Sequence, residues 1–241
     1  MENIENMYSA FEINLLSKSL KLPELKFSTK TDKYVEIIKK KKLNTDESIK
    51  YKYKYKNLLV KENKLILKIA DIGNFEVSDG KKIYWSNSSE KYLEHEIRTY
   101  LLGSVLGALL IQRENLVLHA NALTNDKRTI VCIGDAGRGK STLAYSLMHK
   151  GWKLLSDDLV AVTNNFQVLP GIPRIKLWED AILYYGLDKR NLTKVRSNMD
   201  KYQLSGDQIL SAYSKSRISS IYILEDNYDI KVKEEIKKEK D

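Results

Sequence analysis

Cysteine and histidine are scarce in this sequence. A single cysteine, Cys132, excludes an internal disulfide and a cysteine-rich metal site. It lies in the apolar run "TIVCIG", where we expect a small buried strand residue. The three histidines, His95, His119 and His149, are too few and too scattered for a zinc signature.

Long hydrophobic runs are also missing. The longest candidate, Tyr100 to Ile111, is interrupted by two glycines and a serine, which is typical of a buried helix and not of a membrane span. The N-terminus is acidic and polar and lacks the basic start and apolar stretch of a signal peptide. With 241 residues and 42% hydrophobic content, the chain can fill the core of one sizeable domain or two small ones. We expect a soluble, cytoplasmic protein without a membrane partner.

The charge balance is basic, with 41 lysines and arginines against 32 acids and a formal net charge of +9. The densest runs are "KKKK" at 39–42 and "KYKYK" at 52–56. Alternation at a period of two predicts a strand with tyrosines on one face and lysines in water. We favour this solvated face over a nucleic-acid patch and expect no nucleic-acid partner, while attraction to an acidic peptide stays open.

Two patterns divide the chain. Residues 1–90 form a β-rich region of short, turn-punctuated strands, and "SDGKK" between two strand-forming runs predicts a hairpin. A helical pattern covers 91–112, and strands then alternate with helices. We therefore predict an α+β or α/β fold with domains at 1–90 and 91–241. The charged, helix-prone ending "KVKEEIKKEKD" has no apolar stripe, which fits a chain truncated before a C-terminal packing helix.

One motif matches the phosphate-binding Walker A pattern completely. An apolar strand enters it and the helix "KSTLAYSLMHK" leaves it, which is the context that a P-loop requires. Glycines at 134, 137 and 139 let backbone N–H groups turn toward phosphate oxygens, and the helix N-terminus adds a positive dipole. The predicted nucleotide-binding residues are Gly134, Asp135, Ala136, Gly137, Arg138, Gly139, Lys140, Ser141 and Thr142.

Within this motif, Lys140 is expected to reach the β- and γ-phosphates, Ser141 to ligate Mg²⁺ and Thr142 to lie near the α-phosphate. A Walker A motif by itself predicts only a nucleotide site. The GTPase pattern Asn-Lys-x-Asp is missing, and so are an ATPase-type Walker B motif and a transporter signature. These absences favour a kinase.

Two adjacent acids, Asp157 and Asp158, follow in "WKLLSDDLVAV", at a turn between two predicted strands. Neighbouring carboxylates repel each other, so a partly buried pair needs a cation or a shared proton. One acid can hold Mg²⁺ while the other takes the proton of an attacking hydroxyl. The alternative is a plain Asp-Asp turn exposed to water, and the spacing alone favours the functional pair.

Two further side chains are candidates. His119 lies in the predicted strand "LVLHANAL", where it shares a face with Asn121; it is either a structural histidine or a group that orients Asp158. Arg174 follows the stiff loop "LPGIP", in which Gly171 permits an unusual turn. It is either a surface arginine or a ligand for a phosphate or an acceptor.

In this order and spacing, "LVLHANAL", "GDAGRGKSTLAYSLMHKGWKLLSDDLVAV" and "LPGIPRIKLW" resemble the HPr kinase/phosphorylase-like serine kinases, whose core is similar to that of phosphoenolpyruvate carboxykinase. "FEINLLSKSLKLPEL", "GNFEVSDGKKIYW" and "TYLLGSVLGALLIQREN" resemble the N-terminal portion of stand-alone HPr-kinase-related proteins, including kinases of lasso-peptide precursors. The resemblance implies a P-loop core of the HPr kinase/PEP carboxykinase type. It implies that Asp158 is the general base, that Asp157 contacts metal or phosphate and that His119 supports the base.

The "EIRGLG"-like stretch of the bifunctional enzymes is missing after the acids, and the N-terminal half differs from theirs. The resemblance therefore does not extend to phosphorylase activity or to HPr as substrate. It implies an ATP- and Mg²⁺-dependent kinase whose acceptor is a serine of a precursor peptide or a small protein. Two alternatives remain: a nucleotide-binding sensor without transfer, and a small-molecule kinase with the same site. The oligomeric state is open, a homo-oligomer included.

Overall fold

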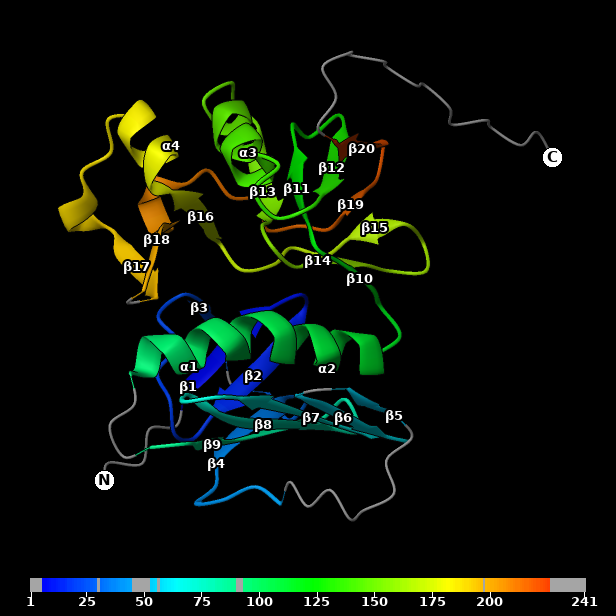
Figure 1. Ribbon diagram of the computed structural model, residues 1–241. Helices are drawn as coiled ribbons and strands as arrows, with labels where there is room; N and C mark the ends of the chain where they lie inside the picture. Colours follow the sequence, from blue (N-terminus) through cyan, green and yellow to red (C-terminus); the bar gives the residue numbers. More distant parts are fainter. Residues whose placement is uncertain are drawn as a thin grey trace.

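The computed structural model describes residues 6–29, 31–44, 53–55, 57–89, 93–196 and 198–225. Within these ranges the protein is a mixed, strand-rich α+β structure with several sheets, which confirms the mixed class of the prediction. Figure 1 shows one large sheet with a long helical segment across its face, and smaller sheets with two short helices beyond that segment. The division into domains at 1–90 and 91–241 stays a prediction.

The N-terminal sheet has nine strands in the order β3-β1-β2-β4-β9-β8-β7-β6-β5 among the described residues. Its strands are β1 (Asn6–Ala10), β2 (Ile13–Ser17), β3 (Lys26–Phe27), β4 (Val35–Lys39), β5 (Tyr53–Tyr55), β6 (Leu58–Lys61), β7 (Lys64–Ile69), β8 (Gly73–Ser78) and β9 (Lys82–Asn87). The predicted hairpin is present, because β8 pairs antiparallel with β9 across Asp79 and Gly80, which both have positive φ. Lys52, Lys56 and the charged tail beyond residue 225 lie outside the described residues.

The predicted helix is present but is not a regular α-helix. It consists of α1 (Glu94–Tyr100), the π-helical turn η1 (Leu101–Val105) and α2 (Leu106–Gln112). Gly103, at φ −118° and ψ −105°, departs from helical geometry inside the turn. The segment packs with buried side chains of the large sheet, including Phe75 and Trp85. No helix in the described ranges is long and apolar enough to span a membrane.

The second half contains three smaller sheets, ordered β10-β14-β15-β19, β13-β11-β12-β20 and β16-β18-β17 in the described part of the chain. Their strands are β10 (Leu116–Leu118), β11 (Ala120–Thr124), β12 (Thr129–Gly134), β13 (Lys153–Ser156), β14 (Val160–Val162), β15 (Gln167–Val168), β16 (Arg174–Trp178), β17 (Thr193–Arg196), β18 (Met199–Ser205), β19 (Ser216–Arg217) and β20 (Ser220–Leu224). The helices are α3 (Lys140–Met148), α4 (Glu179–Tyr184), η2 (Lys189–Asn191) and η3 (Gly206–Gln208). A second hydrophobic core joins α3 and α4 to the strands around Cys132 and Ile175.

Gly171 lies where the two halves of the protein meet. Its φ is not in the left-handed region, so the expected unusual turn is wrong. A Cβ at this position would lie 2.0 Å from Ser156 Oγ and 2.9 Å from Phe11 Cε1. In addition, the Phe11 N–H donates to the carbonyl of Pro170 at 2.8 Å. Glycine is therefore required for close packing of the loop before β16 between the N-terminal hairpin and the strand that leads to the two acids.

We predict that Gly171→Ala lowers the free energy of unfolding by roughly 1–3 kcal/mol, because the added methyl group overpacks this contact. Urea denaturation of the two proteins measures the difference. Combining it with Ser156→Ala should recover part of the loss, since the nearest obstructing atom is then removed. A Gly171→Ala protein as stable as the unmodified one would contradict this account.

Candidate active site

The loop between β12 and α3 folds around the side chain of Lys140. Strand β12 ends at Gly134 and helix α3 begins at Lys140, so the strand, loop and helix occur where the sequence predicts them. Gly137 and Gly139 have φ values of 86° and 76°, which other residues rarely adopt. The ammonium group of Lys140 donates to the carbonyls of Gly134 at 2.7 Å and Asp135 at 2.9 Å. Its side chain therefore spans the loop from helix to strand end.

Asn121 holds the first turn of α3 in place through a hydrogen bond to its backbone. It is fully buried in β11, and its Nδ2 donates to the carbonyl of Lys140. Its Oδ1 has no hydrogen-bond partner among the described residues. The sequence pattern paired Asn121 with His119 on one strand face, and this is wrong because the chain bends at His119 and passes from one sheet to another.

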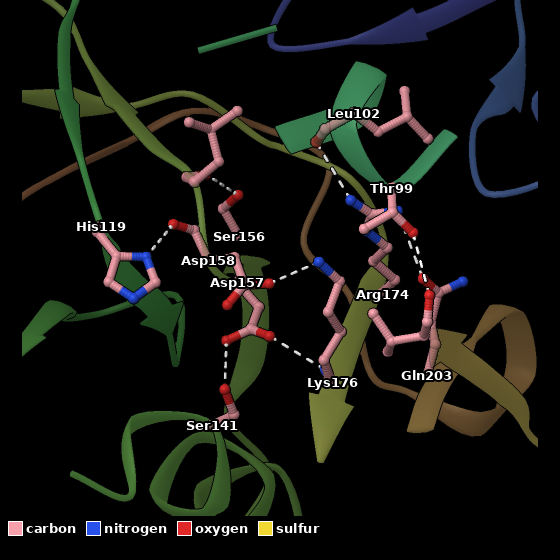
Figure 2. A network of polar contacts seen from close by, with 12 residues as sticks. Thr99, Leu102, His119, Ser141, Ser156, Asp157, Asp158, Arg174, Lys176 and Gln203 are labelled. Atoms are coloured by element: carbon pink, nitrogen blue, oxygen red, sulfur yellow. Dashed lines mark hydrogen bonds and ion pairs between the residues drawn. The ribbon is translucent and has the colours of Figure 1, made fainter. Parts of the chain in front are cut away.

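Ser141 and Asp157, the two predicted metal ligands, lie within hydrogen-bonding distance of each other (Figure 2). Ser141 Oγ donates to Asp157 Oδ1 at 2.9 Å, and the backbone N–H of Lys176 donates to Asp157 Oδ2 at 3.1 Å. A hydroxyl and a carboxylate oxygen fit Mg²⁺, which takes one or two protein oxygens and completes its shell with water and phosphate. The described residues hold no group of three or more histidine, cysteine or acidic side chains that suits a metal by itself.

Different neighbouring charges separate the pKa values of the two acids. Desolvation, and next the charge of Asp158, raise the pKa of Asp157 from 3.8 to about 7, against the lowering effect of its two hydrogen bonds. Burial also acts to raise the pKa of Asp158, but Lys176 and Lys201 outweigh it and lower that pKa to about 2. The pair thus consists of one carboxylate that stays ionised and one that holds a proton easily.

Lys176 is the residue of this site that sequence reasoning missed. Its ammonium group lies 2.7 Å from Asp158 Oδ2, and its side chain is almost completely buried in β16. The only sequence signal is its spacing of two from Arg174 in "RIKLW", which puts both side chains on one face of a strand. The other residues of that strand are apolar. Burial of the two cations depends on contacts with distant elements, which the local sequence does not reveal.

Asp158 itself has a positive φ of 65°, which is uncommon for a residue other than glycine. Its carbonyl oxygen lies 3.0 Å from Nδ1 of His119, an exposed residue between β10 and β11. A carbonyl only accepts hydrogen bonds, so Nδ1 carries the proton in this contact. His119 therefore contacts the backbone of Asp158 and not its carboxylate (Figure 2).

Arg174 lies beside the acids but points away from them. It is buried at the start of β16, and its guanidinium donates to the carbonyl of Leu102 at 3.1 Å and to Gln203 Oε1 at 3.4 Å. Leu102 belongs to the π-helical turn η1, so Arg174 connects the N-terminal helical segment to this strand (Figure 2). Of the two alternatives for Arg174, the surface arginine is wrong, because the guanidinium is buried. Its role as a ligand for a phosphate or an acceptor stays a prediction.

Comparisons with known proteins add a partial likeness to solved structures. Neither the scan against protein-family models nor the search of curated proteins finds a match. Among solved structures, the chain is similar to the HPr(Ser) kinase/phosphatase from Coxiella burnetii, with 30% sequence identity over 27% of this chain and 41% of that chain. The TM-score of 0.20 does not establish a common fold.

The raised pKa of Asp157 predicts a pH-dependent change in stability. Between about pH 4 and pH 7 the folded protein holds a proton that the unfolded chain releases, so the contribution of Asp157 to stability falls as the pH rises through this range. Asp157→Asn removes this effect and keeps groups for both hydrogen bonds. Without nucleotide, the variant should be more stable than the unmodified protein by at least about 1 kcal/mol at pH 8 and should lose that advantage near pH 4.

Thermal and urea unfolding at several pH values measure this difference. Asp207→Asn, at an exposed acid in η3, controls for loss of one negative charge. Equal stability of Asp157→Asn and the unmodified protein at all pH values would contradict the raised pKa.

Proposed function

We propose that this protein is a kinase with a P-loop core, which transfers the γ-phosphoryl group of ATP to a serine hydroxyl of a precursor peptide or small protein. The observation that carries the proposal is the convergence of Ser141, Asp157 and Asp158 beside the loop that Lys140 spans. Phosphoryl transfer requires a phosphate cradle, a place for Mg²⁺ and an acceptor-binding carboxylate, and these groups can supply all three.

The phosphates are bound by the loop from Gly134 to Thr142. Backbone N–H groups of the loop and of the first turn of α3 donate to phosphate oxygens. Lys140, which donates to two loop carbonyls in the free protein, exchanges them for the β- and γ-phosphates. Thr142 lies two residues after Lys140 in α3 and assists near the α-phosphate.

Ser141 and Asp157 would hold Mg²⁺. When bound, this ion neutralises charge that develops on the transferred group and the leaving phosphate. Ser141 Oγ, which donates to Asp157 in the free protein, and the carboxylate of Asp157 would supply the two protein oxygens, and cation binding would release the proton of Asp157 below about pH 7.

Asp158 binds and orients the acceptor hydroxyl. The serine oxygen forms a bond to the γ-phosphorus, the bond from that phosphorus to the bridging oxygen breaks, ADP leaves and the hydroxyl proton passes to Asp158. A carboxylate with a low pKa can act here because the transition state is loose and proton transfer occurs late. Lys176 holds this carboxylate in place, and His119 holds the backbone of the same residue.

A nucleotide sensor without transfer is the second candidate. The observation that favours it is the tight ion pair of Asp158 with Lys176, which occupies one oxygen of the proposed base. Nucleotide binding without any labelled acceptor, across a range of serine peptides, would support this function instead.

We predict that Lys140→Ala abolishes transfer and weakens ATP binding at least about tenfold, because the phosphates lose their main charge partner. Asp158→Asn should bind ATP normally and lose at least about 100-fold in transfer, because the acceptor hydroxyl loses its carboxylate. Titration with nucleotide and transfer of label from ATP to serine peptides, followed by mass spectrometry, measure the two effects separately.

Lys150→Ala, an exposed lysine just after α3, is the matched control for loss of a cation and should leave both activities unchanged. Equal loss of ATP binding in both test variants would argue against Asp158 as the acceptor-binding residue. Full transfer activity of the Asp158→Asn variant would show that Asp158 is not the general base.

A further inference from the structure

The sheet of β16, β18 and β17 has one apolar face and one polar face. Ile175, Leu177 and Leu204 point to the apolar face, where they pack in the second hydrophobic core with α3 and α4. Side chains alternate along a strand, so the residues between these point to the other face. On β16 they are Arg174, Lys176 and Trp178, and their partners on β18 are Ser205, Gln203 and Lys201.

This polar face carries three cations beside the proposed acceptor-binding carboxylate. Lys176 pairs with Asp158, and Arg174 donates to carbonyl and amide oxygens (Figure 2). Lys201 has no ion pair among the described residues, and its ammonium group lies 5.6 Å from the centre of the Trp178 ring. Together with Lys176, Lys201 lowers the pKa of the Asp158 carboxyl against the effect of burial. Lys201 is therefore within electrostatic range of the acceptor hydroxyl.

The acids at the end of β16 do not use the charge of Lys201. Glu179 pairs with Lys189, Asp200 pairs with Lys194, and Asp180 and Arg196 add one charge of each sign. These groups balance one another, so Lys201 is a surplus cation in this part of the protein. Its ammonium group, which rests on an aromatic ring, can still pair with a carboxylate of a ligand.

We propose that this polar face binds the segment of the acceptor peptide next to its serine, and that Lys201 selects an aspartate or glutamate there. This inference rests on the proposed function and adds the class of acceptor. Lys201 faces Trp178, which lies about 7 Å along β16 from Lys176, the residue that holds Asp158. An extended peptide advances about 3.3 Å per residue, so a serine at Asp158 places a residue about two positions away beside Lys201.

The net charge of the protein also favours acidic peptides, so the test must separate the two causes. With a formal net charge of +9, the whole molecule attracts negative ligands. Lys201→Glu and Lys127→Glu change that charge by the same amount. Lys127 is an exposed residue in the turn between β11 and β12, at the end of β12 that lies away from the phosphate-binding loop. General attraction predicts equal effects of the two substitutions, whereas the proposed site predicts an effect of Lys201→Glu alone.

Three synthetic peptides share one serine and carry glutamate, glutamine or lysine two positions to either side of it. Transfer from ATP is measured with the full chain at physiological ionic strength. We expect kcat/KM for the glutamate peptide to exceed that for the glutamine peptide about 3- to 5-fold, mainly through KM. Lys201→Glu should reverse this order, and Lys127→Glu should keep it. The ratio is compared within each protein, because an effect of Lys201→Glu on Asp158 is common to all peptides.

Equal rates for the three peptides, an unchanged ratio in Lys201→Glu, or an equal loss of the preference in both variants would overturn the inference. Lys201→Gln is the second variant, since it removes the cation without adding a carboxylate to the strand, and it should remove most of the preference.

Calorimetric titration of the peptides, with a non-hydrolysable ATP analogue present, tests the polar face without transfer. Tighter binding of the glutamate peptide, weakened by Lys201→Gln and not by Lys127→Gln, would support the inference even if no peptide is phosphorylated, in which case the proposed kinase function fails alone. Absence of peptide binding would overturn the inference. Binding of free glutamate as tight as that of the peptide would do the same, because it would indicate a site for small anions.

Discussion

Repulsion between two adjacent carboxylates, one buried and one partly buried, is the constraint that organises this part of the structure. Asp157 and Asp158 occupy one turn, where both cannot remain ionised without partners. The protein resolves this by giving Asp158 an ammonium group and Asp157 only neutral donors. These partners come from β16 and from α3, so the turn, the strand and the helix must meet at one point for both acids to have their partners.

Strand β16 connects the two acids to the N-terminal helical segment. Three of its side chains, at every second position, lie on one face of the strand. Arg174 reaches the π-helical turn η1, Lys176 holds Asp158, and Trp178 is exposed at the end of the strand. The N-terminal helical segment therefore contacts this strand through a buried guanidinium. A buried cation is costly unless it is fully bonded, which explains why Arg174 takes a carbonyl from an irregular turn of the helix.

The sequence predicts those parts of the fold that local signals determine. The loop before α3 follows from its glycines, and the hairpin at Asp79 follows from its Asp-Gly turn. It does not predict the bend at His119 or the irregular turn at Gly103, because both depend on where distant elements pack. The same holds for Lys176 and Arg174: a lysine and an arginine in a strand are expected in water, and only the nearby acids and the carbonyl of Leu102 make their burial favourable.

Net charge and local charge carry different information about ligands. The lysines that make the chain basic are spread over its length, and at physiological ionic strength their fields fade over about 8 Å. A ligand in contact with the protein is governed by the few charges within that distance. At the end of β16 these include three carboxylates together with the ammonium groups of Lys189, Lys194 and Lys201, which the fold brings together from separate parts of the sequence. Composition therefore describes how molecules first approach this protein, whereas the fold decides which of them fit beside Asp158.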